Sequence, residues 1–142
     1  MKRFVVDANV LMAALKRDGR VRGLLLAAPP HVAFYAPEFL FLEIEEHLDE
    51  LAEDVGVPRL AIEAVLRALR PRITVIPPEA TEHVIHNARL LAQGADAHGD
   101  EEYVALALAM DAPIWSFDKD FDRVPGIRRV ESKTVEEAFA DE

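Results

Sequence analysis

Cysteine is absent from this chain of 142 residues. Its absence excludes a disulfide framework, a thiolate metal site and a cysteine nucleophile, and it is consistent with a reducing cytoplasm. A long apolar run is also missing, because Asp7 and Asn9 interrupt the apolar stretch that follows the basic start, and no small-residue cleavage site comes after it. We therefore expect a cytoplasmic protein with neither an export signal nor a membrane segment.

Basic residues are scarce, with 16 Lys and Arg against 26 Asp and Glu and a formal net charge of −10. This balance argues against a protein that holds nucleic acid mainly by neutralising phosphates. The cations that could guide an RNA backbone are a cluster after the first predicted helix and one lysine near the last acidic motif, namely Lys16, Arg17, Arg20, Arg22 and Lys119. Alternatively, the basic cluster after the first predicted helix is a solvated turn without a role in binding RNA.

Internal repeats, low-complexity stretches and linkers are absent, and no glycine-rich turn follows the first predicted strand. The missing turn argues against a dinucleotide-binding role. Apolar residues make up 51% of the chain and are spread along its length, as in a packed globule. The length suits one domain, so we expect a single domain over residues 1–142.

Strands and helices alternate along the sequence. The apolar patterns predict strands over residues 3–6, 31–36, 73–76, 113–117 and 127–130. Between them they predict a helix from about residue 9, one long amphipathic helix over 40–55, further helices over 59–69 and 81–93, a buried helix over 103–110, and a terminal helix capped by Thr134 with Glu137. This order predicts an α/β fold with three layers, in which helices cover both faces of a parallel sheet of four to five strands.

Four acidic residues stand where such a fold places its ligand crevice. Asp7 and Asp118 directly follow the first and fourth predicted strands, and Asp100 opens the buried helix. Glu43 lies in the first part of the long helix, although Glu46 and Glu50 share nearly the same helical face. Any one of these acids could be a simple cap or turn former, but the combination is more specific than its parts.

Carboxylates brought together repel one another, which raises their pKa values and destabilises the fold unless cations bind between them. Hard oxygen donors, with neither cysteine nor a helical HExxH motif, favour Mg²⁺ or Mn²⁺ over Zn²⁺. Such ions activate water and stabilise the leaving oxygen of a phosphodiester. The acids Asp7, Glu43, Asp100 and Asp118 thus predict metal-dependent phosphoryl-transfer chemistry.

Four segments, VDANVLMAAL, PEFLFLEIEEH, DEEYVALALAM and SFDKDF, resemble in order and spacing the acidic motifs of the PIN-domain family, which includes the VapC-type toxins. The resemblance spans Val6 to Phe121. It implies a Mg²⁺- or Mn²⁺-dependent endoribonuclease, often a homodimer, whose metal-binding and catalytic acids fall on Asp7, Glu43, Asp100 and Asp118 and whose polar residue after the first acid falls on Asn9. It leaves open a toxin with an antitoxin partner or a stand-alone nuclease.

Several alternatives stay open at this point. Asp120 could share or replace the role of Asp118, and Asp96 could compete with Asp100. An Asp-centred phosphotransfer or phosphatase domain would also place an acid after its first strand. It needs a second acid beside the first or an Asp two residues later, where this chain has Asn9, and a late Lys after a strand, for which the chain offers only Lys119. A catalytically inactive PIN-like binding module is the third possibility, which the presence of all four acids disfavours.

Overall fold

Five strands form one sheet in the computed structural model, which describes residues 1–17, 19–94 and 100–140. The strand order is β3-β2-β1-β4-β5, and every neighbouring pair is parallel. The strands are β1 (Lys2–Val6), β2 (Val32–Pro37), β3 (Ile73–Ile76), β4 (Ile114–Trp115) and β5 (Arg129–Val130). The predicted α/β class and parallel sheet are therefore confirmed.

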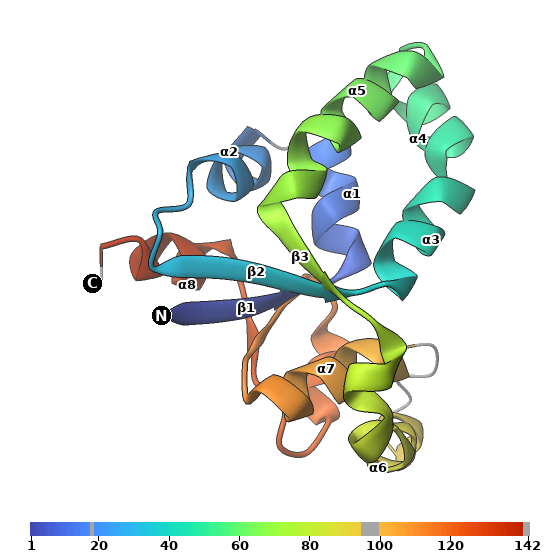
Figure 1. Cartoon of the computed structure of the whole chain (residues 1–142). Coiled ribbons are helices and arrows are strands. Elements are labelled where there is room, and N and C mark those ends of the chain that lie inside the picture. The colour runs from blue at the N-terminus through green and yellow to red at the C-terminus, as the bar shows by residue number, and fades with distance from the viewer. Residues whose placement is uncertain (18, 95–99, 141–142) are drawn as a thin grey trace.

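Helices cover both faces of this sheet (Figure 1). One layer holds α1 (Ala8–Lys16), α2 (Gly19–Ala27), α3 (Phe39–Glu46), α4 (Leu48–Val55) and α5 (Arg59–Leu69). The opposite layer holds α6 (Glu82–Gly94) and α7 (Glu101–Met110), while α8 (Ser132–Ala138) contacts α2 and β5. Short 3₁₀ turns are η1 (Arg70–Arg72), η2 (Pro78–Thr81) and η3 (Lys119–Arg123). None of the helices in the described ranges is long and apolar enough to cross a bilayer.

The central strands are apolar because both of their faces are covered. Val5, Val6, Ile114 and Trp115 are fully buried. The Trp115 indole donates from Nε1 to Ser132 Oγ at 3.3 Å, so its polar edge is satisfied inside the core. Burial of these short strands is what holds the ends of β1 and β4 in place.

Two local predictions were wrong and one helix was not anticipated. The long amphipathic helix is in fact two helices, α3 and α4, separated at His47, whose backbone has φ −109° and ψ 7°. The apolar stripe continues across this break, so periodicity alone could not show it. The terminal helix begins at Ser132, with Thr134 inside it instead of at its cap. Helix α2 spans Gly19–Ala27, where the sequence had indicated only a basic turn.

The chain order makes β1 the topological switch point of the sheet. From β1 the chain moves outward to β2 and β3, and it then crosses to the other side of β1 to form β4 and β5. Ligands of open α/β sheets bind at such a switch point, outside the carboxyl ends of the strands. The register pairs Val6 with Trp115, which sets Asp7 and Ser116 next to each other at that edge.

Candidate active site

Asp7 lies at the junction of β1 and α1, at the carboxyl edge of the sheet. It caps the helix, and its Oδ1 accepts a hydrogen bond from the Ala8 amide at 2.7 Å. Its Oδ2 accepts from Ser116 Oγ at 2.6 Å, and the residue is only 6% exposed. Burial raises the pKa of Asp7 to about 6, against the lowering effect of these two hydrogen bonds, and the charges of Glu43 and Asp118 raise it further.

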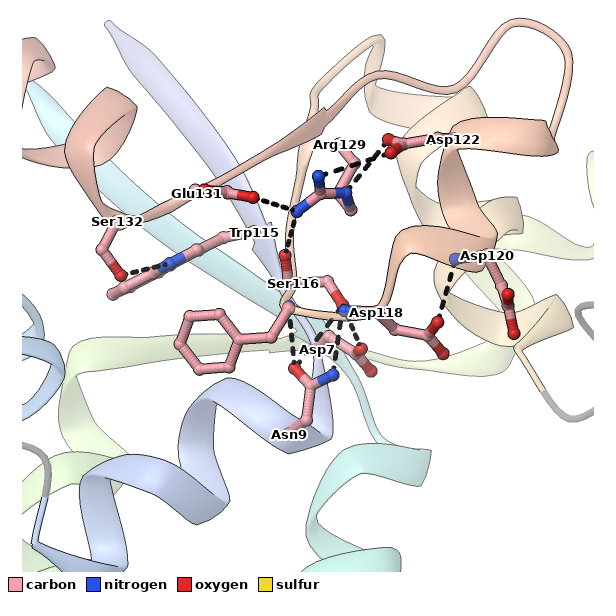
Figure 2. A network of polar contacts seen from close by, with 11 residues as sticks. Asp7, Asn9, Trp115, Ser116, Asp118, Asp120, Asp122, Arg129, Glu131 and Ser132 are labelled. Atoms are coloured by element: carbon pink, nitrogen blue, oxygen red, sulfur yellow. Dashed lines mark hydrogen bonds and ion pairs between the residues drawn. The ribbon is translucent and has the colours of Figure 1, made fainter.

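Ser116 is the centre of a polar network that joins β4 to Asp7 (Figure 2). Its hydroxyl donates to Asp7 and accepts from the Asp118 amide at 2.9 Å and from Asn9 Nδ2 at 3.3 Å. The serine is fully buried, and every hydrogen-bonding capacity of its hydroxyl is used. Ser116 was not among the predicted site residues, although a serine inside the buried segment PIWSF is the kind of residue that needs a polar partner.

Asn9, the polar residue of the first motif, reaches across from the first turn of α1 to the segment after β4. Besides its bond to Ser116, its Oδ1 accepts from the Phe117 amide at 3.4 Å. Figure 2 shows the side chains of Asn9 and Asp7 on the same side of Ser116. Asn9 therefore fixes the backbone that leads to Asp118.

Asp118 caps the short turn η3, which begins at Lys119. Its Oδ1 accepts from the amide of Asp120 at 2.9 Å, which orients the carboxylate. The negative charge of Asp118 is one of those that raise the pKa values of Asp7 and Asp100. By contrast, Asp120 lies 3.9 Å from the guanidinium of Arg123. This geometry favours Asp118 over Asp120 as the fourth acid of the cluster.

Glu43 comes from α3, the helix that follows the carboxyl end of β2. Its Oε1 accepts a hydrogen bond from the Tyr103 hydroxyl at 2.7 Å. Burial raises the pKa of Glu43, whereas the bond from Tyr103 and the charge of His47 lower it. Tyr103 is 1% exposed and was not selected from the sequence, because it lies within the apolar run of α7.

Asp100 is the residue before α7 and supplies no side-chain cap to that helix. Burial raises the pKa of Asp100 to about 7, and the charges of Asp7, Asp118, Glu43 and Glu101 add to the effect. The four predicted acids thus act electrostatically on one another at the carboxyl edge of the sheet. Asp96, the alternative to Asp100, lies outside the described residues.

The cluster has the donor chemistry for a divalent cation. In the described ranges, none of the four acids forms an ion pair with Lys, Arg or His. Within the same ranges, no three acidic or histidine side chains are close enough together to hold one ion directly. Mg²⁺ binds through one or two carboxylates and keeps several of its waters, so widely spaced carboxylates that lack a counter-charge still suit it.

The predicted substrate-binding cations lie in two places. Lys119 is exposed and directly follows Asp118. The basic cluster lies at the opposite end of α1 from Asp7, about 13 Å along a helix of 9 residues. Its members contact other groups there: Lys16 pairs with Asp54, Arg17 donates to the Val55 carbonyl, Arg20 pairs with Glu136, and Arg22 donates to the Ala14 carbonyl. The structure does not bring this cluster together with the carboxylates.

Arg129 supports the segment that follows β4, and no sequence pattern indicated this role. Its guanidinium donates to the Ser116 carbonyl and to Glu131, both at 3.0 Å, and it pairs with both carboxylate oxygens of Asp122 (Figure 2). The side chain is 9% exposed. It therefore ties β5 to the end of β4 and to η3.

Replacing Arg129 by Met is expected to lower the free energy of unfolding by about 1–3 kcal/mol, because hydrogen bonds to charged groups are lost at a largely buried position. Urea unfolding measures the change. The matched control is Arg128→Met, at an exposed neighbouring position, where a change within about 0.5 kcal/mol is expected. Equal losses of unfolding free energy in both variants would show that the network around Arg129 does not contribute to stability.

Comparison with known proteins supports the same assignment of fold. Several solved structures are similar. They include VapBC2 from Rickettsia felis bound to a promoter DNA fragment, with 11% identity, a TM-score of 0.71, and coverage of 91% of this chain and 98% of that chain. PAE2754 from Pyrobaculum aerophilum is similar with 15% identity, a TM-score of 0.72, and coverage of 99% and 97%. A toxin–antitoxin complex from Klebsiella pneumoniae is similar with 18% identity, a TM-score of 0.60, and coverage of 91% and 97%.

At these identities the structural likeness concerns the fold alone. No sequence among the curated proteins matches this chain. A family model does match it, that of the PIN domain, over residues 5–140. This match includes all four acidic motifs and nearly the whole sheet. The chain belongs to the PIN-domain family.

Proposed function

We propose that this protein is a Mg²⁺- or Mn²⁺-dependent endoribonuclease that hydrolyses RNA phosphodiester bonds at the carboxylates of Asp7, Glu43, Asp100 and Asp118. PIN domains are generally nucleases, and this chain has the four acids of such a site. The observation that carries the proposal is the shared electrostatic environment of the cluster. Burial and neighbouring negative charge raise the pKa of Asp7 to about 6 and that of Asp100 to about 7, and none of the four acids forms an ion pair with a cation of the described residues.

One or two of these carboxylates would hold the metal directly and the others through its waters. When bound, the metal would supply Lewis acidity to activate a water and to offset charge on the phosphate. The surrounding residues keep these carboxylates in position. Ser116 fixes one oxygen of Asp7. Asn9 fixes the chain that carries Asp118. Because these carboxylates are already held in position, the site needs little rearrangement when substrate binds.

Electrostatics also bears on the RNA substrate. A chain with a net charge of −10 repels phosphates unless the metal and local cations offset the repulsion. Lys119 stands beside Asp118 and is the nearest of the proposed substrate-binding cations in sequence. Contacts of Lys16, Arg17, Arg20 and Arg22 with RNA stay a prediction, and they would involve nucleotides away from the cleaved bond.

Partner proteins are a second part of the proposal. The similar structures from Rickettsia felis and Klebsiella pneumoniae are described as VapBC2 and as a toxin–antitoxin complex. These descriptions support an antitoxin partner for this chain. A homodimer is what the resemblance to the PIN-domain family implies, and it stays a prediction. Expression together with the product of the adjacent reading frame, followed by size-exclusion chromatography with light scattering, tests both. A protein that elutes as a monomer and leaves the neighbouring product unbound would contradict this part.

Cleavage of a mixed RNA pool tests the enzymatic proposal directly. With Mn²⁺ or Mg²⁺ we expect internal cuts, and with EDTA we expect none, because the acids alone cannot neutralise the phosphate. Glu45→Gln, on the exposed part of α3, is a control that should cut as the wild type does. Cleavage that persists in EDTA would refute metal dependence. Intact RNA with both ions, together with release of phosphate from a phosphomonoester, would favour the phosphatase alternative, and neither activity would favour a binding module.

A further inference from the structure

The contact between Tyr103 and Glu43 joins two elements that are far apart in the chain. The Tyr103 hydroxyl donates to Glu43 Oε1 at 2.7 Å, and 60 positions separate the two residues. Neither side chain makes another hydrogen bond among the described residues, and this one links α7 to α3 across the carboxyl edge of the sheet. The second oxygen of Glu43 has no such donor there, so it remains available to another ligand.

Asp100 stands immediately before α7 and Tyr103 is the third residue of that helix, so the two are three residues apart. Residues at this spacing lie on the same side of a helix, about one turn from each other. The helix therefore presents one acid of the cluster directly and holds a second acid through a phenol. The negative charges of Glu43, Asp7 and Asp100 all act on the Tyr103 hydroxyl, which places it within the cluster rather than in a separate part of the core.

Resting on the proposed function above, we propose that Tyr103 is a positioning residue for the metal site: it holds Oε1 of Glu43 by a hydrogen bond and leaves Oε2 to bind a divalent cation. A phenol is a donor at neutral pH and it is rigid apart from two side-chain torsions. In a buried position it restricts the rotamers of the glutamate it contacts. A glutamate on the second turn of a helix would otherwise sample several orientations, and each lost rotamer costs free energy on binding.

A purely structural role makes a different prediction. A buried tyrosine needs a partner for its hydroxyl, and Glu43 would then serve only to satisfy Tyr103. In that case removal of the hydroxyl changes stability and leaves the affinity for metal as it was. In the positioning role, the affinity for metal falls even when the fold is retained.

Tyr103→Phe separates the two roles, because it removes one oxygen and keeps the ring. We expect Mn²⁺ to bind about 10–100-fold more weakly, the usual effect of losing a group that orients a metal ligand. Titration calorimetry, or electron paramagnetic resonance of free Mn²⁺, measures this without any substrate. RNA cleavage by the variant should be lost at limiting Mn²⁺ and should rise toward the wild-type rate as Mn²⁺ is increased.

The chain contains one other tyrosine, which provides a matched control. Tyr35 lies on β2, and its hydroxyl makes no hydrogen bond in the part of the chain that the structure describes. Tyr35→Phe should bind Mn²⁺ as the wild type does. A double-mutant cycle adds a second control, because Tyr103→Phe should have no further effect on Mn²⁺ affinity in a Glu43→Gln background.

Unchanged Mn²⁺ affinity in a folded Tyr103→Phe variant, or an equal loss with Tyr35→Phe, would overturn the positioning role while the nuclease proposal stands. A wild-type protein that binds no Mn²⁺ and cuts no RNA would overturn both. If Tyr103→Phe does not fold, a crystal structure of the wild type with Mn²⁺ decides: Glu43 should contact the ion through Oε2 and keep Tyr103 on Oε1. An ion bound without Glu43, or a broken hydrogen bond, contradicts the proposal.

Discussion

RNA cleavage by an Asp7→Asn variant is expected to be about a thousandfold slower than that of the wild type, or slower still. Asp7 is the most buried acid of the cluster, and its negative charge raises the pKa of Asp100. The amide keeps the shape of the side chain but removes one negative charge from the proposed metal site. Metal ions contribute several kcal/mol to such reactions, which corresponds to a rate change of about this size. Initial rates with Mn²⁺ on a mixed RNA pool measure it.

The same variant is not expected to gain stability, although it removes a repulsive charge. Both carboxylate oxygens of Asp7 accept hydrogen bonds, one from the Ala8 amide and one from Ser116. In asparagine one of these acceptors becomes an NH₂ donor, which then faces another donor at a buried position and costs about 1–3 kcal/mol. Circular dichroism should confirm that the fold is kept. Glu45→Gln is the control, and cleavage by Asp7→Asn at the wild-type rate would refute the mechanism proposed here.

The metal-free protein is expected to be markedly less stable at pH 8 than at pH 5. The pKa values of Asp7 and Asp100 in the folded state are raised from 3.8 to about 6 and about 7. Between pH 3.8 and these raised values, the folded state therefore binds more protons than the unfolded state. Stability contributed by the protonated groups is full below about pH 4 and is lost as the pH rises through 6 and 7. For Asp7 alone, the rise in pKa from 3.8 to about 6 corresponds to roughly 3 kcal/mol between about pH 3 and pH 8, and about half of this loss falls between pH 5 and pH 8. Thermal unfolding in EDTA across this range measures the loss.

Asp100→Asn should flatten this pH dependence and unfold at a higher temperature than the wild type at pH 8 in EDTA. Asp100 makes no side-chain cap bond, so the substitution relieves repulsion without breaking a cap. Because the group is partly exposed, solvent screening reduces the expected gain to roughly 1–2 kcal/mol, or several degrees in Tm.

Addition of Mg²⁺ provides a second test of whether Asp100 belongs to the metal site. Binding to the folded state alone should raise the Tm of the wild type at pH 8, and it should raise that of Asp100→Asn much less. Glu45→Gln, with its exposed acid, should follow the wild type in both experiments. Equal pH profiles for wild type and Asp100→Asn, or equal shifts with Mg²⁺, would show that Asp100 does not belong to the metal site.

The sequence by itself determined the fold class and the approximate places of the four acids. These features are local: buried parallel strands appear as short apolar runs, helices as apolar stripes, and strand ends and helix starts can be located from either pattern. Asp7 follows β1, Asp118 follows the β4 segment, and Asp100 precedes α7, as the patterns indicated. Glu43 could not be distinguished from its neighbours on the helix by pattern alone, and it came from the family resemblance.

The tertiary structure decided which polar groups support those acids. Ser116 meets Asp7 across 109 positions of sequence, and Tyr103 meets Glu43 across 60. The order of strands β1 and β4 and the packing of α7 near α3 bring these pairs together, and neither is a property of a local apolar pattern. The break at His47 was also hidden, because a stripe of apolar residues stays in phase across one non-helical residue. Local periodicity records which side chains are buried, whereas contacts between distant segments depend on how those buried faces are arranged in space.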